Sequence, residues 1–351
     1  MPLLAPGTRA ARNSREWPIA GGRDTGRATL PGVSDGDWFE PLQRVIARRP
    51  PVSMLRWVER TLGGGATVVA CRRLHGGLTT SVHRLTVEDA GGHRRSVVLK
   101  RWIPGSEEAR ESMIEITARE ARTLEQVGIA GIPAPGLLGF TPGGGGRDGE
   151  HSAILMTRAP GRIDLTPADP HAWVAEMAAT LATIHSADVA ARRWTGWVDP
   201  SELASPSWTA QPDLWRAAID AAAQADRDAT RHGTFIHGDY QHFNHLWSRS
   251  RLRSVIDWTF AARGPAGIDV GHCRLNLAVL HSAELAEDFL AAYEAEVGVR
   301  VDPAWDLRAL LSYDQAWKRF IPIQVAGRAI IDLTEMDKRV EATMAAALRR
   351  L

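Results

Sequence analysis

A short run in the second half of the chain combines residue types that phosphate chemistry uses. Asp239 follows His237 by two residues, and Asn244 comes five residues after Asp239 (244 − 239). A second apolar stretch delivers Asp257 thirteen residues after Asn244 (257 − 244). Phosphoryl transfer needs one carboxylate to orient or deprotonate a hydroxyl, and amide and carboxylate oxygens to hold Mg²⁺ against nucleotide phosphates. Each residue alone is compatible with a turn or a helix cap, but the spaced set predicts a phosphotransfer site.

A cation for the nucleotide phosphates is expected in the first half of the chain. Lys100 closes the apolar run 97–99, which predicts a strand that aims its ammonium group at a fixed point. Glu120 lies twenty residues later (120 − 100) in a predicted helix, and a lysine–glutamate pair between strand and helix positions the phosphate-binding lysine of kinases. Glu111 and Glu115 on the same helix are the rival partners.

A glycine-containing turn is expected to cover the phosphates. Gly76, Gly77, Thr79 and Ser81 lie between the first two predicted strands, where backbone N–H groups and hydroxyls can contact phosphate oxygens. The turn does not match G-x-G-x-x-G, and a plain hairpin turn looks similar. The chain contains no G-x-x-x-x-G-K-[ST] sequence, so a Walker-type site is not predicted.

The elements that must position these residues fall into two groups. The expected strands cover 66–74, 82–88, 96–102, 136–141 and 153–157, and two shorter runs lie around 235–236 and 255–256. Expected helices cover 38–49, 53–62, 107–127, 173–185, 211–232, 284–297 and 307–319. A hinge is expected at 159–161. The pattern predicts an α+β protein with a β-rich first lobe and a larger, mainly helical second lobe.

Composition narrows the class of protein. The chain has 351 residues, a net charge of +1 and only two cysteines, which gives no reason to expect a nucleic-acid partner, an anionic membrane or a disulfide framework. It contains no apolar run of about 18 residues and no signal-like N-terminus, so neither a membrane span nor secretion is expected. These features favour a cytoplasmic location. Residues 1–50 are predicted to be a partly disordered extension.

Between about residues 55 and 300 the chain resembles the aminoglycoside phosphotransferase / choline kinase-like family, which has a bilobal protein-kinase-like fold. The matching motifs are the loop 76–81, Lys100, the helix around Glu120, the hinge strand 155–161, the stretch 181–186, the loop 237–244, the stretch 256–258 and the stretch 264–269. The resemblance implies a nucleotide-binding lobe over 51–160 and a C-terminal lobe over 161–351 that holds the catalytic loop, the metal site and the acceptor-binding helices.

The family's roles can be carried over to individual residues. Asp239 is then the catalytic base, supported by His237, and Asn244 and Asp257 are the Mg²⁺ ligands. Lys100 contacts the phosphates of ATP or GTP with the support of Glu120. The residues expected near the phosphates and the adenine are Gly76, Gly77, Thr79, Ser81, Met156 and Arg158. Asp269 is either a brace for the catalytic loop or a helix N-cap, and His185 is a core histidine near that loop.

The expected acceptor is a small molecule with a hydroxyl group, and its identity is open. A polycationic aminoglycoside needs a carboxylate-lined cleft. The candidate acids, which are equally explained as solvated helix faces, are Asp164, Asp213, Asp220, Glu284, Glu287 and Asp288. The tryptophans expected either in an acceptor wall or in the core are Trp173, Trp194, Trp197, Trp208 and Trp215.

Other functions also remain open. They are a metabolic kinase for an amino alcohol, a sugar or homoserine, a non-catalytic nucleotide-binding protein, and a protein kinase. His242 and His245 flank Asn244, so a transition-metal site is a minor alternative. The sequence predicts no oligomeric state.

Overall fold

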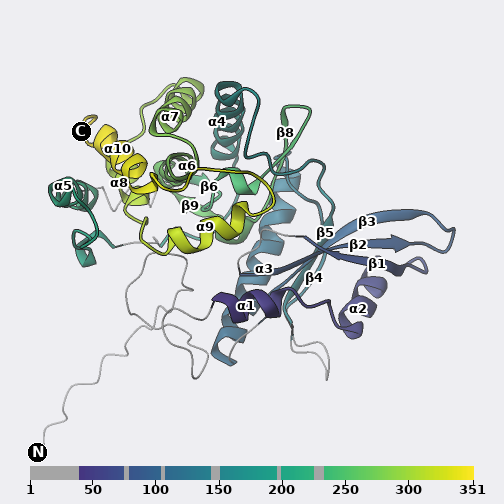
Figure 1. The fold of residues 1–351 in the computed structure, drawn as a ribbon. Coiled ribbons are helices and arrows are strands. Elements are labelled where there is room, and N and C mark those ends of the chain that lie inside the picture. The colour runs from purple at the N-terminus through teal and green to yellow at the C-terminus, as the bar shows by residue number, and fades with distance from the viewer. Residues whose placement is uncertain (1–38, 75–78, 104–106, 144–150, 196–198, 225–232) are drawn as a thin grey trace, which may run out of the picture.

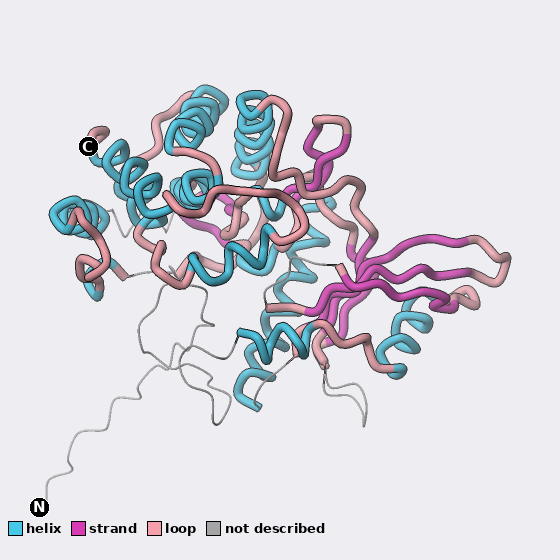
Figure 2. Tube along the Cα trace, viewed as in Figure 1, coloured by secondary structure: helices cyan, strands magenta, loops and turns pink. Residues whose placement is uncertain are grey.

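The computed structural model describes residues 39–74, 79–103, 107–143, 151–195, 199–224 and 233–351. They form two lobes, a sheet-containing N-terminal lobe and a larger helical C-terminal lobe (Figure 1). Colouring by secondary structure separates the lobes clearly, with most strands on one side and most helices on the other (Figure 2). The expected α+β bilobal architecture is therefore confirmed.

The N-terminal lobe is built on a five-stranded antiparallel sheet of order β1-β2-β3-β5-β4. Its strands are β1 (Thr67–Arg73), β2 (Ser81–Glu88), β3 (Arg94–Arg101), β4 (Leu137–Thr141) and β5 (Ala153–Thr157). All five were expected from β-branched residues between turn residues, with ends shifted by one or two positions. Central strand β3 places Lys100 opposite Val82 on β2 and Ile154 on β5.

The two faces of this sheet have different roles because side chains alternate along a strand. Leu85, Val97, Leu99 and Leu155 share one buried cluster with helix α2 (Val52–Leu62). Lys100 belongs to the other face, together with Ile154 and Met156, which pack into the main core of the protein. The alternation thus turns Lys100 toward the C-terminal lobe, where its Nζ contacts Asp257 and Thr259.

Helix α3 (Glu107–Ile129) crosses between the sheet and the helical lobe (Figure 1). Its buried side chains Met113, Thr117, Ala121 and Leu124 recur at three- and four-residue intervals, which places them on one face of the helix. Glu120 lies on the same side and is only 1% exposed. A carboxylate this deeply buried needs a charged partner.

The C-terminal lobe is mainly helical around the largest hydrophobic cluster. Its helices are α4 (Pro170–Ser186), α5 (Pro212–Ala223), α6 (Gly267–Leu280), α7 (Ala283–Val297), α8 (Pro303–Leu310), α9 (Trp317–Val325) and α10 (Met336–Leu348). Every residue of α6 is buried, so this helix forms the centre of the lobe. The remaining described helix, α1 (Phe39–Ile46), lies in the N-terminal extension and was expected there.

A small β insertion carries the chemistry-bearing loops of the second lobe. Strand β6 (Thr234–Ile236) pairs with β9 (Ala262–Gly264), and β7 (His245–Ser248) pairs with β8 (Arg251–Val255). A short 3₁₀ turn at His242–Asn244 closes the loop 237–244, and another at Trp258–Phe260 follows Asp257. The two pairs bring 237–244 and 257 side by side.

Several helix predictions were wrong in detail. The expected helix 307–319 is two helices, because the chain turns at 311–316 and the Asp314 carboxylate accepts a hydrogen bond from the Ala316 N–H before α9. The expected helix 211–232 ends at Ala223 in α5, and 225–232 lies outside the described residues. Helices α6 and α10 were not predicted. No helix in the described part of the chain is both long and apolar enough to cross a membrane.

Candidate active site

The predicted catalytic loop, residues 237–244, begins where β6 ends and makes a sharp turn at Gly238. This glycine has a φ of +81°, and a Cβ built on it would lie 2.3 Å from the Phe260 carbonyl oxygen. A side chain is therefore excluded by backbone conformation and by space. The glycine lets the loop pass close to the segment after Asp257 and present Asp239 beyond it.

Asp269 on α6 fixes the main chain of this loop. Its carboxylate accepts hydrogen bonds from the N–H groups of His237 and Gly238, both at 2.7 Å. His185 Nε2 lies 3.1 Å from the same carboxylate, and Tyr293 Oη lies 2.7 Å from His185 Nδ1. Burial alone would raise the pKa of Asp269, but the His185 contact and the other hydrogen bonds lower it below its ordinary value.

This geometry decides between the two interpretations of Asp269. It lies in the first turn of α6, where the N-cap position is Ala266 and no side chain caps the helix. Asp269 is therefore a brace of the catalytic loop and not an N-cap. His185 is the core histidine that the sequence suggested, and it acts on the loop through Asp269.

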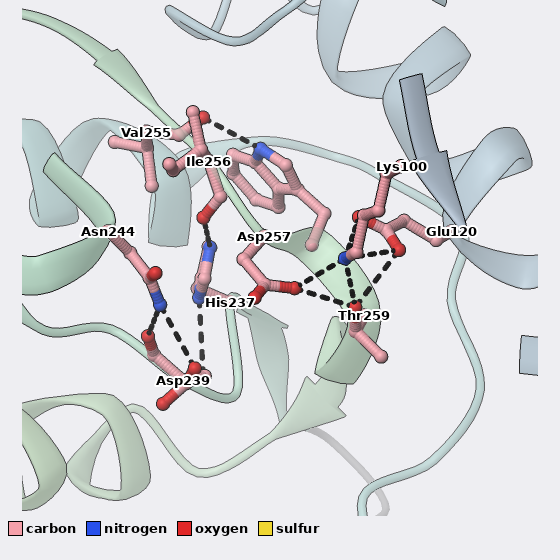
Figure 3. A network of polar contacts seen from close by, with 10 residues as sticks. Lys100, Glu120, His237, Asp239, Asn244, Val255, Ile256, Asp257 and Thr259 are labelled. Carbon is pink, nitrogen blue, oxygen red and sulfur yellow. Dashed lines mark hydrogen bonds and ion pairs between the residues drawn. The ribbon is translucent and has the colours of Figure 1, made fainter. Parts of the chain in front are cut away.

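His237 connects the catalytic loop to the strand that delivers Asp257. Its Nδ1 accepts a hydrogen bond from the Asp239 N–H at 3.2 Å, and its Nε2 donates to the Ile256 carbonyl oxygen at 3.0 Å (Figure 3). Burial lowers the pKa of His237, which favours the neutral ring that this pattern requires. The predicted supporting role of His237 agrees with these contacts.

The Asp239 carboxylate is held by three side-chain donors. Asn244 Nδ2 donates to Oδ2 at 2.9 Å, Gln241 Nε2 donates to Oδ1 at 2.6 Å, and His272 Nε2 lies 2.9 Å from Oδ1. The side chain of Asp239 remains 18% exposed. It is therefore fixed in orientation and still open to an incoming molecule.

Asp257 joins the two lobes of the site. It follows β8 with a left-handed φ of +66°, which is uncommon for a residue with a side chain. Its Oδ1 accepts hydrogen bonds from Lys100 Nζ and from Thr259 Oγ1, both at 2.7 Å (Figure 3). A backbone this constrained is typical of functional sites.

Lys100 and Glu120 complete the polar cluster around Asp257. Lys100 Nζ donates to the two Glu120 oxygens at 2.9 and 2.8 Å and to Thr259 Oγ1 at 2.8 Å. The rival acid Glu115 pairs instead with Arg119 on its own helix. Burial would lower the pKa of Lys100, but Asp257 and Glu120 raise it, so the ammonium stays charged. Lys100 also opposes the effect of burial on Asp257 and lowers the pKa of that carboxyl.

Asn244 and Asp257 have the donor atoms that Mg²⁺ prefers. The Asn244 amide nitrogen is engaged by the main-chain and carboxylate oxygens of Asp239, which leaves its amide oxygen to act as a ligand. The Asp257 side chain is 40% exposed, and its contacts with Lys100 and Thr259 use Oδ1. Mg²⁺ retains several waters and needs few protein oxygens, so these two residues fit it.

Not all of the other predicted nucleotide-binding residues lie on the Lys100 face of the sheet. Met156 is buried on the Lys100 face of the sheet, and Arg158 is exposed just after β5. Thr79 is half-buried before β2. The Ser81 hydroxyl is turned away from the Lys100 face and accepts a hydrogen bond from Arg101 at 2.8 Å, because Ser81 and Arg101 pair in the β2–β3 register. Gly76 and Gly77 lie outside the described residues.

Thr259, Gln241 and His272 are site residues that the sequence analysis missed. Thr259 bridges Lys100, Glu120 and Asp257, while Gln241 and His272 contact Asp239. Gln241 and Thr259 each lie two residues from a predicted site residue, so proximity could have suggested them. His272 lies 33 residues from Asp239, and nothing in the local pattern points to that contact.

Three of the candidate acceptor-binding acids contact basic side chains of the chain. Asp213 pairs with Arg216, Glu287 with Arg274, and Asp288 with His171. The tryptophans follow the core interpretation: Trp173, Trp194 and Trp215 are buried and Trp208 packs against the core, while Trp197 lies outside the described residues. Neither set defines an acceptor cleft.

His242 and His245 do not form a metal site with their neighbours. Both are fully buried, and within the described ranges no group of three or more His, Cys, Asp or Glu side chains could hold a metal ion. His242 packs against Trp173, Phe243 and His281. Burial of His242 within the loop 237–244 and of His245 at the start of β7 supports a packing role for both.

These buried histidines predict an acid-sensitive fold. Burial lowers the pKa of His83 and His281 from 6.5 to about 4, and it also lowers the pKa of His237, His242 and His245. Below about pH 6.5 these histidines become protonated in the unfolded chain while they stay neutral in the folded chain. The free energy of unfolding therefore falls as pH falls. Each such histidine contributes a slope of up to about 1.4 kcal/mol per pH unit.

Urea unfolding at a series of pH values between 7.5 and 4.5 checks this expectation. His281→Gln should make the slope shallower, because the glutamine takes up no proton when the chain unfolds. A free energy of unfolding that stays constant between pH 7.5 and 4.5 would contradict the expectation that protonation of these histidines destabilises the fold.

Comparison with known proteins agrees with this geometry. The Phosphotransferase enzyme family model matches residues 70–311, which is more than half of the chain. A search of curated protein sequences returned no match. A crystal structure of a protein from Ralstonia eutropha JMP134 described as an aminoglycoside phosphotransferase superposes with a TM-score of 0.54 at 16% identity, covering 85% of this chain and 97% of that one.

A second similar structure is a thermostable mutant of aminoglycoside phosphotransferase APH(4)-Ia in a ternary complex with AMP-PNP and hygromycin B. It superposes with a TM-score of 0.53 at 17% identity and covers 85% of this chain and 98% of that one. At such identities the superpositions establish a shared kinase-like fold, and the family match covers both the Lys100 lobe and the Asp239 loop. The chain therefore belongs to the phosphotransferase enzyme family.

Proposed function

We propose that the protein transfers the γ-phosphoryl group of ATP to a hydroxyl group of an aminoglycoside-like small molecule, with Mg²⁺ bound to Asn244 and Asp257. The observation that carries the proposal is the 2.7 Å contact between Lys100 and Asp257, which joins the phosphate-binding lysine of one lobe to the metal ligand of the other. Asp239 lies on the adjoining loop, tied to the Asp257 strand through His237. Residues 51–160 then serve as the nucleotide-binding lobe, and 161–351 supply the metal and acceptor sites.

Each residue has a defined task in this reaction. Lys100, held by Glu120, contacts the nucleotide phosphates, while the apolar face around Met156 receives the base of the nucleotide. Asp239 orients the acceptor hydroxyl and takes its proton as the oxygen attacks the γ-phosphorus atom, while the bond from that phosphorus to the β-phosphate oxygen breaks and ADP leaves. Bound Mg²⁺ neutralises charge on the phosphate oxygens. The chain otherwise contributes position and electrostatics, which dominate phosphoryl transfer.

The acceptor has two candidate classes. Aminoglycosides are favoured by the fold shared with APH(4)-Ia. A less cationic metabolic acceptor, such as an amino alcohol, a sugar or homoserine, is favoured by the pairing of Asp213 and Glu287 with arginines of the chain, because a polycationic ligand needs uncommitted carboxylates.

An acceptor screen tests the proposal. The purified protein is incubated with ATP or GTP, with Mg²⁺ or EDTA, and with aminoglycosides, macrolides, choline, homoserine and sugars. The expected result is one class of acceptor that gains a phosphoryl group, detected by mass spectrometry, only with nucleotide and Mg²⁺. Mg²⁺-dependent nucleotide binding without transfer to any acceptor would instead support a non-catalytic nucleotide-binding protein, and phosphorylation of a protein substrate would support a protein kinase.

A further inference from the structure

We propose that His272 on α6 is a positioning residue for Asp239, and that it selects which carboxylate oxygen receives the acceptor hydroxyl. This inference rests on the proposed function, because it assigns a role in the step that Asp239 performs. His272 Nε2 lies 2.9 Å from Asp239 Oδ1, and its side chain is only 6% exposed. The contact joins the central helix of the C-terminal lobe to the carboxylate of the catalytic loop.

The contact belongs to a repeated pattern on one face of α6. Asp269, His272 and Asn276 lie at positions i, i+3 and i+7, which share a face of an α-helix. Asp269 holds the main chain of the loop, and His272 holds the side chain of its central residue. Asn276 Nδ2 donates to the His272 carbonyl oxygen at 3.0 Å and lies 3.2 Å from His272 Nε2. One helical face therefore fixes both the backbone and the carboxylate.

The helix that carries His272 cannot shift easily. A Cβ on the neighbouring Gly271 would lie 2.7 Å from the Ala309 Cβ and 2.8 Å from the Asp306 carbonyl oxygen, so α6 packs directly against α8. On the same helix, Arg274 has no exposed side-chain surface and pairs with Asp306 and Glu287. Packing on two neighbouring helices gives His272 a fixed position, which a positioning residue requires.

The hydrogen bonds to Asp239 leave one lone-pair site of its carboxylate free. A carboxylate has about four lone-pair sites, two on each oxygen. Gln241 and His272 supply two donors to Oδ1, and Asn244 supplies one to Oδ2. The site that remains is on Oδ2, so the acceptor hydroxyl is directed to that oxygen. Because Oδ1 is an acceptor in this contact, His272 Nε2 carries the hydrogen and donates it.

Loss of His272 should affect turnover more than binding. Without this donor the carboxylate keeps only Gln241 on Oδ1 and can rotate away from the acceptor, and a displacement of about 1 Å costs on the order of 100-fold in rate. Nucleotide binding depends on the cluster of Lys100 and Asp257, whereas the His272 side chain contacts the carboxylate of Asp239. His272→Leu should therefore lower kcat by about 10- to 100-fold and leave the KM for nucleotide within about threefold.

Matched variants separate positioning from packing. His272→Gln retains an N–H donor at a similar reach and should recover kcat to within about threefold of the wild-type protein. Val279→Ala removes buried atoms from α6 without touching Asp239, and it should lower stability while leaving kcat unchanged. The proposal is overturned if His272→Leu keeps wild-type kcat, or if His272→Gln folds normally and loses as much kcat as His272→Leu.

A measurement without turnover tests the contact itself. In ¹⁵N-histidine NMR spectra of the wild-type protein, the His272 ring should show the Nε2–H tautomer, and its resonances should shift in Asp239→Asn. Unchanged His272 resonances in that variant would overturn the inference even if His272→Leu failed to fold. A wild-type protein that phosphorylates no acceptor would instead overturn the proposed function, and the NMR result would still report on the contact.

Discussion

Asp239→Ala is expected to lower kcat by about 10²- to 10⁴-fold, the range typical of a lost general base. The reason is that Asp239 is the only carboxylate of the catalytic loop and the only one held there by Asn244, Gln241 and His272 in the described structure. The affinity for nucleotide should change by less than about threefold, because the Lys100–Asp257 contact does not involve Asp239 and Asn244 keeps its hydrogen bond to the main-chain carbonyl oxygen of residue 239.

Steady-state kinetics with the acceptor found in the screen would measure this effect. Asp239→Asn is the matched control, since it keeps the shape of the side chain and removes the basic oxygen, so it should lose nearly as much kcat. If either variant turned over at the wild-type rate, Asp239 could not be the base.

Asp269→Ala is expected to have the largest combined effect on stability and activity. It removes the acceptor of two buried main-chain N–H groups, at His237 and Gly238, and the partner of His185. Leaving several buried groups unpaired should lower the free energy of unfolding by about 3–5 kcal/mol. The variant should also lose most of its turnover, because the loop that positions Asp239 would no longer be held by Asp269.

Urea unfolding and kcat, both measured at a temperature where the variant remains folded, would test this expectation. Asp269→Asn keeps one carbonyl oxygen as an acceptor and should lie between the wild-type protein and Asp269→Ala in both quantities. A stable Asp269→Ala protein with normal turnover would show that the brace has no role.

Much of the fold was predictable because local patterns and tertiary structure agree. The strands of the N-terminal lobe follow from β-branched runs between turn residues, and α3 follows from its apolar spacing. The spacing from Asp239 to Asn244 anticipated their hydrogen bond, and the segment before Asp257 lies beside them, where the Ile256 N–H donates to the Asn244 carbonyl oxygen. The lysine–glutamate pair was also anticipated, and burial on α3 selects Glu120 over Glu115.

The features of the fold that were not predicted depend on long-range contacts, which a local sequence pattern does not indicate. Helix α6 is buried on all sides and mixes apolar residues with Asp269, His272 and Arg274, so it shows little amphipathic period. The chain turn between α8 and α9 interrupts a stretch that looks continuously helical. The face occupied by Ser81 depends on strand register, and a shift of one residue would reverse it.

The most direct test of the central claim is calorimetric titration of a non-hydrolysable ATP analogue into the wild-type protein and three variants in the presence of Mg²⁺. We expect Lys100→Ala and Asp257→Ala to weaken binding by more than about tenfold, and Asp239→Ala to bind like the wild-type protein. EDTA should weaken binding to the wild-type protein and have little further effect on Asp257→Ala. Equal affinities of the wild-type protein and Asp257→Ala would show that Lys100 and Asp257 do not form one nucleotide site.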